Sequence, residues 1–187
     1  MSELLKKAQE YEAEMVKQAA GARPAFHVTA PVGWINDPNG FSWYEGKCHL
    51  FCQYHPYSTQ WGPMYWAHYR TEDMVRWELL PCAMAPDEAY DAGGCFSGSA
   101  LETEAGHVLM YTAVMLETDA DGRSRMRQQQ AIAIGDGETY HKLAGNPVIT
   151  SDMLPEGCSR EDFRDPKIWK EGDRYYALMA KDRKSVV

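Results

Sequence analysis

One unit recurs along this sequence and limits the folds that it can adopt. Asp37-Pro38 is followed by the letters WYEG and an apolar strand, and Asp165-Pro166 is followed by WKEG and another apolar strand. Ser97-Gly98, with the letters EAG and a further apolar strand behind it, is a degenerate third copy. A strand, a tight turn and a second strand are how a propeller blade begins, so the repeat predicts an all-β propeller fold.

The spacing of the repeat predicts how much of a propeller the chain holds. Trp43 and Trp169 span two repeats, which gives roughly 63 residues per blade. Propellers typically have 4–8 blades, so closure at this spacing needs roughly 250 residues or more. The chain has 187 residues. We therefore expect a truncated chain, with an N-terminal helix over residues 1–22 and a partial propeller of two to three blades over residues 23–187.

The N-terminal segment predicts one amphipathic helix over residues 2–20. Its apolar residues fall on one face at helical spacing, and Ser2 and Gly21 are suited to its start and its end. The apolar face consists of Leu4, Ala8, Tyr11, Met15 and Ala19. We expect this helix to pack on the main domain and to carry no chemistry.

Short runs of strand-forming residues follow, separated by turn residues. The pair Glu45-Gly46 is suited to a tight hairpin turn before the first clear strand. The predicted strands are Lys47–Tyr54, Tyr65–Arg70, Phe96–Leu101, Val108–Met115, Gln129–Ile134, Lys167–Trp169 and Arg174–Met179. The six Trp and eleven Tyr residues are interpreted mainly as packing within these sheets, although aromatic rings also stack on sugars.

Composition excludes several classes of function. The formal net charge is −8 and no cluster of Lys and Arg occurs, so we expect no nucleic-acid partner. The five cysteines contain no C-x-x-C pair, which favours reduced thiols over disulfides or zinc. His55 and His68 are interpreted as hydrogen-bonded sheet residues rather than ligands. We expect neither a signal peptide nor a membrane span, and place the protein in the cytoplasm.

Two carboxylates are the candidates for chemistry. Asp37 lies in WINDPNG, a segment rich in turn formers, so it can be interpreted simply as a turn residue. The second Asp-Pro pair, preceded by Arg164, favours another interpretation. Equivalent strand positions of different blades face one central channel, so Asp37 and Asp165 are expected to converge there. Paired carboxylates in an aromatic pocket are typical of glycoside hydrolysis.

Five motifs in order extend this interpretation: WINDPNG, FCQYHP, WGPMYWAH, CFSGSA and FRDP, over residues 34 to 166. Together they resemble glycoside hydrolase family 32, the invertases, sucrose-6-phosphate hydrolases and fructanases. The resemblance implies a five-bladed propeller followed by a β-sandwich. It also implies retaining hydrolysis of β-fructofuranosyl bonds in sucrose, sucrose 6-phosphate or fructans. No metal or organic cofactor is implied, and the expected partner is a small sugar.

The resemblance also assigns roles to single residues. It implies that Asp37 is the nucleophile, that Asp165 holds fructose hydroxyls and stabilises the transition state, and that Arg164 positions groups around them. The remaining sugar-binding candidates are Trp34, Ile35, Asn36, Gln53, Trp61, Phe96 and Ser97.

One part of the family pattern is missing. The general acid in the family is a Glu of a Glu-Cys pair beyond the RDP motif, and no such pair occurs in this sequence. Two alternatives therefore stay open beside the enzyme: an inactive fragment, and a sugar-binding propeller module without catalysis. A propeller that displays a protein-binding surface is disfavoured by the carboxylates and Arg164 at the channel.

Overall fold

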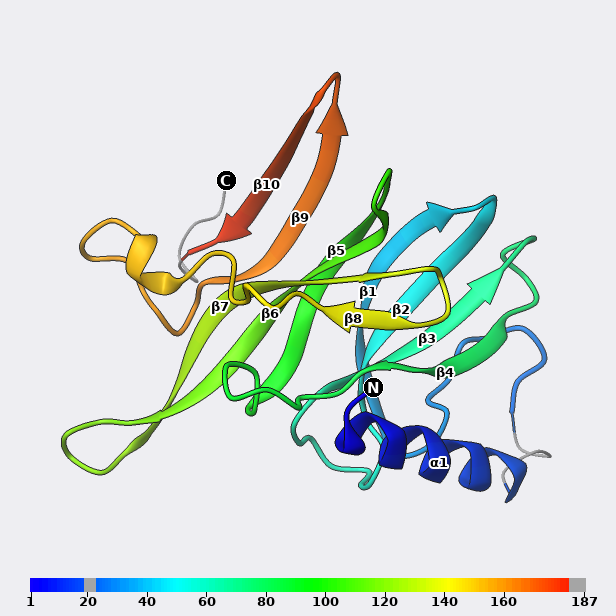
Figure 1. Ribbon diagram of the computed structural model, residues 1–187. Coiled ribbons are helices and arrows are strands. Elements are labelled where there is room, and N and C mark those ends of the chain that lie inside the picture. Colours follow the sequence, from blue (N-terminus) through cyan, green and yellow to red (C-terminus); the bar gives the residue numbers. More distant parts are fainter. Residues whose placement is uncertain (19–22, 182–187) are drawn as a thin grey trace.

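Three antiparallel sheets and one long helix make up the computed structural model, which describes residues 1–18 and 23–181 (Figure 1). The helix is α1 (Glu3–Gln18). Blade one holds β1 (Trp34–Tyr44), β2 (Lys47–His55), β3 (Tyr65–Thr71) and β4 (Glu78–Met84). Blade two holds β5 (Gly94–Thr103), β6 (Gly106–Thr118), β7 (Ser124–Gly135) and β8 (Tyr140–Lys142). The 3₁₀ turn η1 (Ser151–Met153) precedes a hairpin of β9 (Arg164–Glu171) and β10 (Arg174–Ala180).

The first strands of the three sheets lie side by side. β5 has β1 on one side and β9 on the other, and each sheet leads outward from this row (Figure 1). This is the arrangement of consecutive propeller blades around an axis, so the predicted all-β propeller fold is confirmed. Two blades are four-stranded and the third sheet has two strands among the residues described.

The predicted strands all form, and the predicted hairpin turn is confirmed. Glu45 and Gly46 both have positive φ, 47° and 76°, as a two-residue type I′ turn requires. Three strands were not predicted: β1, β4 and β8. β1 contains Asn, Asp, Pro and Gly, β4 contains Pro81, and β8 has only three residues, so none of them shows a clear strand pattern.

Aromatic side chains form most of the core, as the sequence indicated. One cluster joins blades one and two and includes Phe51, Trp66 and Tyr111, all fully buried. A second cluster lies between blade one and α1 and includes Tyr54 and Tyr69. Each large ring removes a large apolar area from water, so these clusters fix the blades against each other.

Helix α1 packs beside β4, the outer strand of blade one (Figure 1). Ser2 caps the helix, since its Oγ accepts from the Leu5 N–H at 3.1 Å. The buried face agrees with the predicted one at Ala8 but differs elsewhere, because its other buried residues are Leu5 and Glu12. Leu4, Tyr11 and Met15 are only partly buried, and Ala19 and Gly21 lie outside the described residues.

Two polar side chains of α1 explain why its buried face is rotated from the predicted one. Gln9 Nε2 donates to the Cys82 carbonyl at 2.8 Å, and Glu12 Oε2 accepts from the Cys82 N–H at 3.0 Å. The helix therefore covers backbone groups at the free edge of β4. Burial of Glu12 raises the pKa of its carboxyl to about 7, against the hydrogen bond from Cys82 and the charge of Arg23.

Three histidines are buried where blade one meets blade two. His49 Nδ1 and His68 Nε2 are 2.9 Å apart, and His107 joins Tyr140 OH at 2.7 Å and Ser42 Oγ at 2.9 Å. Burial lowers the pKa of His49 to about 4 and that of His107 to about 3, and it lowers the pKa of His68 strongly. The three rings are therefore neutral and act as hydrogen-bonding core residues.

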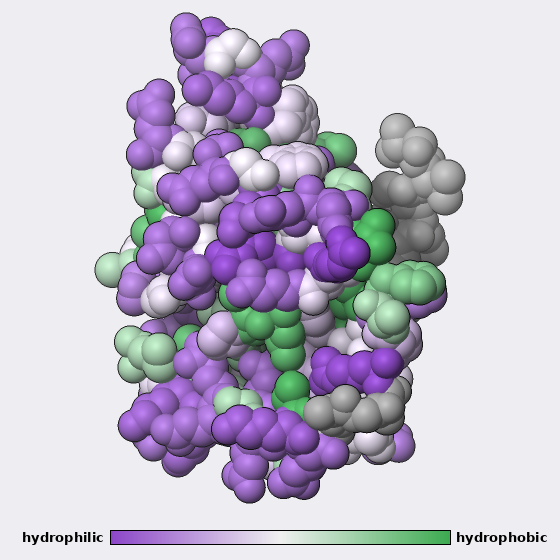
Figure 2. All heavy atoms as spheres, turned by 90° about the vertical axis from the view of Figure 1, so that its right-hand side faces the viewer, coloured by the Kyte–Doolittle hydropathy of each residue, from purple (hydrophilic) through white to green (hydrophobic). Residues whose placement is uncertain are grey.

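The surface on one side of the molecule is polar. Figure 2 shows the face at the right of Figure 1, where hydrophilic residues predominate and apolar ones appear only in small groups. All five cysteines are free, and four of them are buried. Among the described residues, no helix is long and apolar enough to cross a membrane.

Candidate active site

Each of the three adjacent first strands carries a β-bulge at its candidate residue. In β1 the pairing advances from Ile35 to Pro38 while β2 advances by only two residues, which leaves Asp37 inside the bulge. The same irregularity in β5 lies at Ser97, and in β9 it lies between Arg164 and Lys167. A bulge re-aims a side chain out of the normal alternation of a strand. The three copies of the sequence repeat therefore meet in space at their bulges.

Ser97 joins the first two bulges. Its Oγ donates to Asp37 Oδ2 at 2.9 Å and accepts from Gln53 Nε2 at 2.7 Å. With its amide oriented to satisfy both ends, Asn39 also donates to Ser97 Oγ at 3.2 Å and accepts from the Gln53 N–H at 3.3 Å. One hydroxyl thus uses its single proton on the Asp37 carboxylate, which fixes that carboxylate's orientation.

The other oxygen of Asp37 is less engaged. Asn36 Nδ2 approaches Asp37 Oδ1 at 3.4 Å, and Trp34 Nε1 donates to Asn36 Oδ1 at 3.3 Å. The Asp37 side chain is exposed, so Oδ1 is open to an incoming electrophilic carbon. Ile35 is placed apart from these groups, half-buried against the cluster beneath α1.

Asp165 lies in the third bulge with an unusual backbone. Its φ is +57°, the left-handed region that a residue with a Cβ rarely adopts. Partial burial raises the pKa of the Asp165 carboxyl; Arg164 opposes this shift and the negative charge of Asp37 adds to it. Asp37 therefore lies close enough to Asp165 for its charge to affect the Asp165 pKa, in line with the expected convergence of the two residues. Both residues are on the surface, and the Asp165 side chain is 55% exposed, so it is only partly desolvated.

An aromatic and polar cavity of about 650 Å³ lies next to this bulge; Arg164 lines it, whereas Asp37 and Asp165 do not. Trp61 and Phe96 stand at its wall with their rings nearly perpendicular and their centroids 6.2 Å apart. Arg164 also lines it and pairs with Asp162 at 2.9 Å, while its Nε lies 3.9 Å from Asp165 Oδ2. This cavity provides flat apolar surface, arginine side chains and the carboxylates of Glu161 and Asp162, which are features that bind a hydroxylated ring.

Two further polar residues, which were not predicted, bind backbone groups at and just before the bulge of β9. Thr112 Oγ1 accepts from the Asp165 N–H at 3.0 Å, and Gln130 Nε2 donates to the Phe163 carbonyl at 2.8 Å. Both side chains are fully buried. A threonine or glutamine within a strand has no distinctive sequence pattern, so only the three-dimensional register reveals them.

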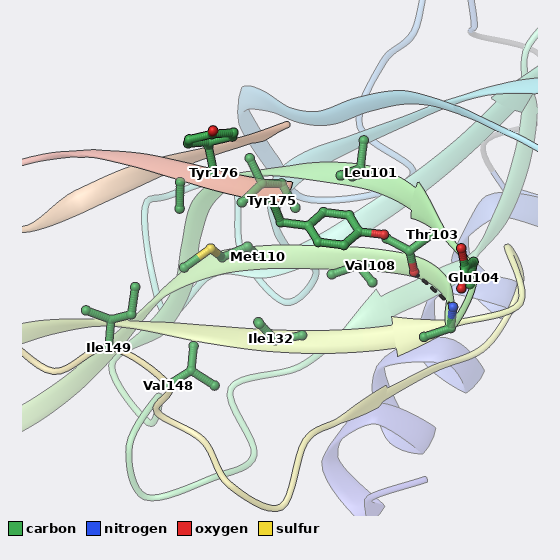
Figure 3. Close-up of a pocket in the computed structure, with 13 residues that line it drawn as sticks. Leu101, Thr103, Glu104, Val108, Met110, Ile132, Val148, Ile149, Tyr175 and Tyr176 are labelled. Carbon is green, nitrogen blue, oxygen red and sulfur yellow. Dashed lines mark hydrogen bonds between the residues drawn. The ribbon is translucent and has the colours of Figure 1, made fainter. Parts of the chain in front are cut away.

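A second cavity, of about 560 Å³, has a different character (Figure 3). Leu101, Val108 and Met110 of blade two face Tyr175 and Tyr176 of β10 across it. Its lining is almost entirely apolar, and none of the candidate site residues contributes to it. It is a gap between two sheets rather than a place for polar chemistry.

Comparison with known proteins identifies the family of the chain. The model of the glycosyl hydrolases family 32 N-terminal domain matches residues 27–187. The chain belongs to glycosyl hydrolase family 32. The resemblance found in the five motifs is thereby confirmed.

Curated family 32 relatives include sugar hydrolases of bacteria. A sucrose-6-phosphate hydrolase of Zymomonas mobilis is 39% identical over 176 residues, which covers 90% of this chain and 33% of that protein. A sucrose-6-phosphate hydrolase of Escherichia coli is 40% identical over 161 residues, covering 85% of this chain and 32% of that protein. The family 32 chain therefore spans about a third of the length of these relatives.

Solved family 32 structures have the same fold. A β-fructofuranosidase of Bombyx mori matches with a TM-score of 0.80 and 37% identity, over 96% of this chain and 38% of that one. A sucrose-6-phosphate hydrolase of Lactobacillus gasseri matches with a TM-score of 0.76 and 35% identity, over 94% of this chain and 35% of that one.

Proposed function

We propose that this chain supplies the nucleophile side of a retaining hydrolase for β-fructofuranosyl bonds, with sucrose or sucrose 6-phosphate as substrate. The observation that carries the proposal is the meeting of Asp37, Ser97 and Asp165 at three adjacent bulges. The names of its relatives, among them sucrose-6-phosphate hydrolases and a levanase of Bacillus subtilis, support the substrate class.

In the proposed first step, Asp37 Oδ1 attacks the anomeric carbon of the fructosyl unit. The bond from that carbon to the leaving oxygen breaks, and a general acid protonates that oxygen. Ser97 holds the other carboxylate oxygen, so the attacking lone pair is already aimed. Water then cleaves the fructosyl ester and regenerates Asp37.

Asp165 has a different proposed role. Carbon–oxygen cleavage leaves positive charge on the ring, and a nearby carboxylate stabilises that charge as it develops. Bonds from Asp165 to ring hydroxyls that tighten in the transition state accelerate the reaction more than they strengthen binding. Trp61 and Phe96 supply flat surface for the sugar, and Arg164 supplies a charge beside Asp165.

The proton donor is proposed to come from elsewhere. The Glu-Cys pair that the family uses does not occur in the 187 residues, and the chain spans about a third of its relatives. The activity is therefore proposed for this chain joined to the regions that its relatives carry beyond it. The alternative is an inactive fragment or a sugar-binding module, in which the same carboxylates bind fructose without turnover.

A chimera tests the proposal. Residues 1–187 replace the matching N-terminal third of the sucrose-6-phosphate hydrolase of Escherichia coli, and fructose release from sucrose and sucrose 6-phosphate is measured. The purified 187-residue chain is assayed beside it. We expect turnover by the chimera and none by the chain alone. A well-folded chimera that binds fructose but releases none from either substrate would establish the binding module instead.

A further inference from the structure

We infer that Thr112 is a positioning residue, which sets the Asp165 carboxylate relative to Asp37 by tying the bulge of β9 to the bulge of β5. The inference rests on the proposed function. It adds a residue that no motif of the sequence indicates.

The hydroxyl of Thr112 bonds to both bulges at once. Its Oγ1 accepts from the Asp165 N–H at 3.0 Å and donates to the Ser97 carbonyl at 3.1 Å. A hydroxyl has one proton and two acceptor lone pairs, so one group can make both bonds. Gln130 Oε1 lies farther away, at 3.4 Å. Ser97 in turn holds the Asp37 carboxylate, which makes Thr112 the middle of a path from Asp37 to Asp165.

The backbone of Asp165 needs an external partner. β9 pairs with β10 at Arg164 and at Lys167, with the bulge between these positions. The φ of +57° at Asp165 is disfavoured for a residue with a side chain, and such a conformation persists only where its surroundings impose it. Thr112 supplies the bond that holds this N–H, and Gln130 holds the Phe163 carbonyl two residues earlier.

The same device occurs one blade earlier. Gln53 on β2 donates to Ser97 Oγ at 2.7 Å, and Thr112 on β6 bonds to the Asp165 N–H. In both cases a polar residue on the second strand of one blade fixes the bulge in the first strand of the next. Gln53 holds a side-chain hydroxyl, that of Ser97, whereas Thr112 holds a backbone N–H.

Burial separates this role from sugar binding. Thr112 has no exposed surface, so it cannot touch a substrate in the cavity. Loss of its hydroxyl would let Asp165 move while the cavity wall stays in place. A carboxylate misplaced by about 1 Å slows chemistry by about 100-fold, and interactions specific to the transition state affect turnover rather than binding.

The test uses Thr112→Val, which keeps the shape and removes the hydroxyl, with Thr112→Ser as the matched control. In the chimera, we expect Thr112→Val to lower kcat by about 10- to 100-fold with KM changed less than about threefold. Thr112→Ser should recover most of the kcat. In an Asp165→Asn background, Thr112→Val should add little, because its effect passes through that carboxylate. If Thr112→Val does not fold, Thr112→Cys carries the same expectation.

Three results would overturn the inference: a Thr112→Val kcat within about threefold of the parent, equal losses for the Ser and Val variants, or an undiminished loss in the Asp165→Asn background.

A parent chimera without turnover would instead refute the proposed function. The inference is then decided on the 187-residue chain by hydrogen exchange of the Asp165 amide. Its protection should be lost in Thr112→Val and kept in Thr112→Ser; protection that survives in the Val variant contradicts it.

Discussion

Asp37 takes its strongest hydrogen bond from the neighbouring blade rather than from its own. Ser97 Oγ donates to it at 2.9 Å, whereas Asn36, its neighbour in β1, approaches only to 3.4 Å. The orientation of the carboxylate thus depends on how blades one and two are packed. A residue far away in the shared core can therefore influence the reacting group through the position of β5.

Replacement of Asp37 by Asn tests its proposed role at this scale. The amide keeps the shape and can still accept from Ser97, but it is a far weaker nucleophile. We expect the chimera's turnover to fall by several orders of magnitude with little change in substrate binding. Steady-state kinetics on sucrose measures both. Residual activity above about a tenth would mean that the activation barrier had risen by less than about 1.4 kcal/mol, and it would rule out Asp37 as the nucleophile.

The sequence predicted the residues at the bulges and one residue that supports them, Gln53, but it missed Thr112 and Gln130. Asp37, Asp165, Gln53 and Ser97 stand in distinctive motifs, so their type and order were informative. Thr112 acts through its hydroxyl on a backbone group of another blade. That contact depends on the one-residue bulge in β9, and no local pattern encodes such a register.

Helix α1 shows how an element is fixed by a few polar groups. Its buried face includes Glu12, only 3% exposed, where a regular amphipathic helix would place an apolar residue. The apolar periodicity predicted Leu4 and Tyr11 instead, because periodicity carries no information about hydrogen bonds to an edge strand. The bond to the Cys82 N–H turns the helix toward β4.

This docking makes stability depend on pH. The pKa of Glu12 is raised to about 7, so the folded chain holds a proton that the unfolded chain releases above its ordinary pKa. Stability from this group is therefore full below about pH 4.5 and declines as pH rises to about 7. Glu12→Gln keeps the acceptor for Cys82 without the charge. We expect it to raise the free energy of unfolding by about 1–3 kcal/mol at pH 8.

Denaturant unfolding of the 187-residue chain at pH 5 and pH 8 provides the measurement. The difference between Glu12→Gln and the parent should shrink at pH 5, where Glu12 is mostly protonated. Glu14, which is exposed on the same helix, gives the control variant Glu14→Gln. An equal gain from both variants would mean that only net charge matters.

At the scale of the whole molecule, the histidine cluster makes stability fall as the pH falls, which is the opposite of the effect of Glu12. His49, His68 and His107 are neutral in the folded chain because burial lowers each pKa. The unfolded chain gains protons below about pH 6.5, so stability is lost as pH falls from there toward about 4. Each histidine costs on the order of 2 kcal/mol at pH 5. The stability that the three histidines lose in acid exceeds the stability that Glu12 gains there. We therefore expect acid to separate blade one from blade two.

Melting curves between pH 7.5 and pH 5 test this expectation. The midpoint should fall steadily in the parent chain. His107→Gln, which removes one titrating ring from the interface, should give a shallower decline even if its stability at pH 7.5 is lower. A variant with the slope of the parent would show that the acid sensitivity arises elsewhere.

The open flanks of the molecule lead to a prediction about association. Phe41 and Trp43 of β1 are 54% and 51% exposed, and Leu178 of β10 is 66% exposed. Together with the apolar cavity beside β10, they form surfaces of the kind that promote aggregation. We expect the 187-residue chain alone to self-associate in size-exclusion chromatography with light scattering. Leu178→Ser with Phe41→Ser should raise the monomer fraction, and a parent chain that is monomeric at all concentrations would contradict the prediction.

The bulges have a consequence for the gene rather than for the folded chain. Because each bulge is one extra residue, the direction of Asp37 and Asp165 is set by the number of codons as much as by their identity. Deletion of the single codon for Asn36 would leave every strand with its usual residue types and restore regular pairing between Ile35 and Pro38, while the second irregularity of β1, between Asn39 and Ser42, would remain. It would also turn the residues on one side of the deletion to the opposite face of the sheet. An in-frame loss of three nucleotides could thus silence the site while the aspartate codon stays intact.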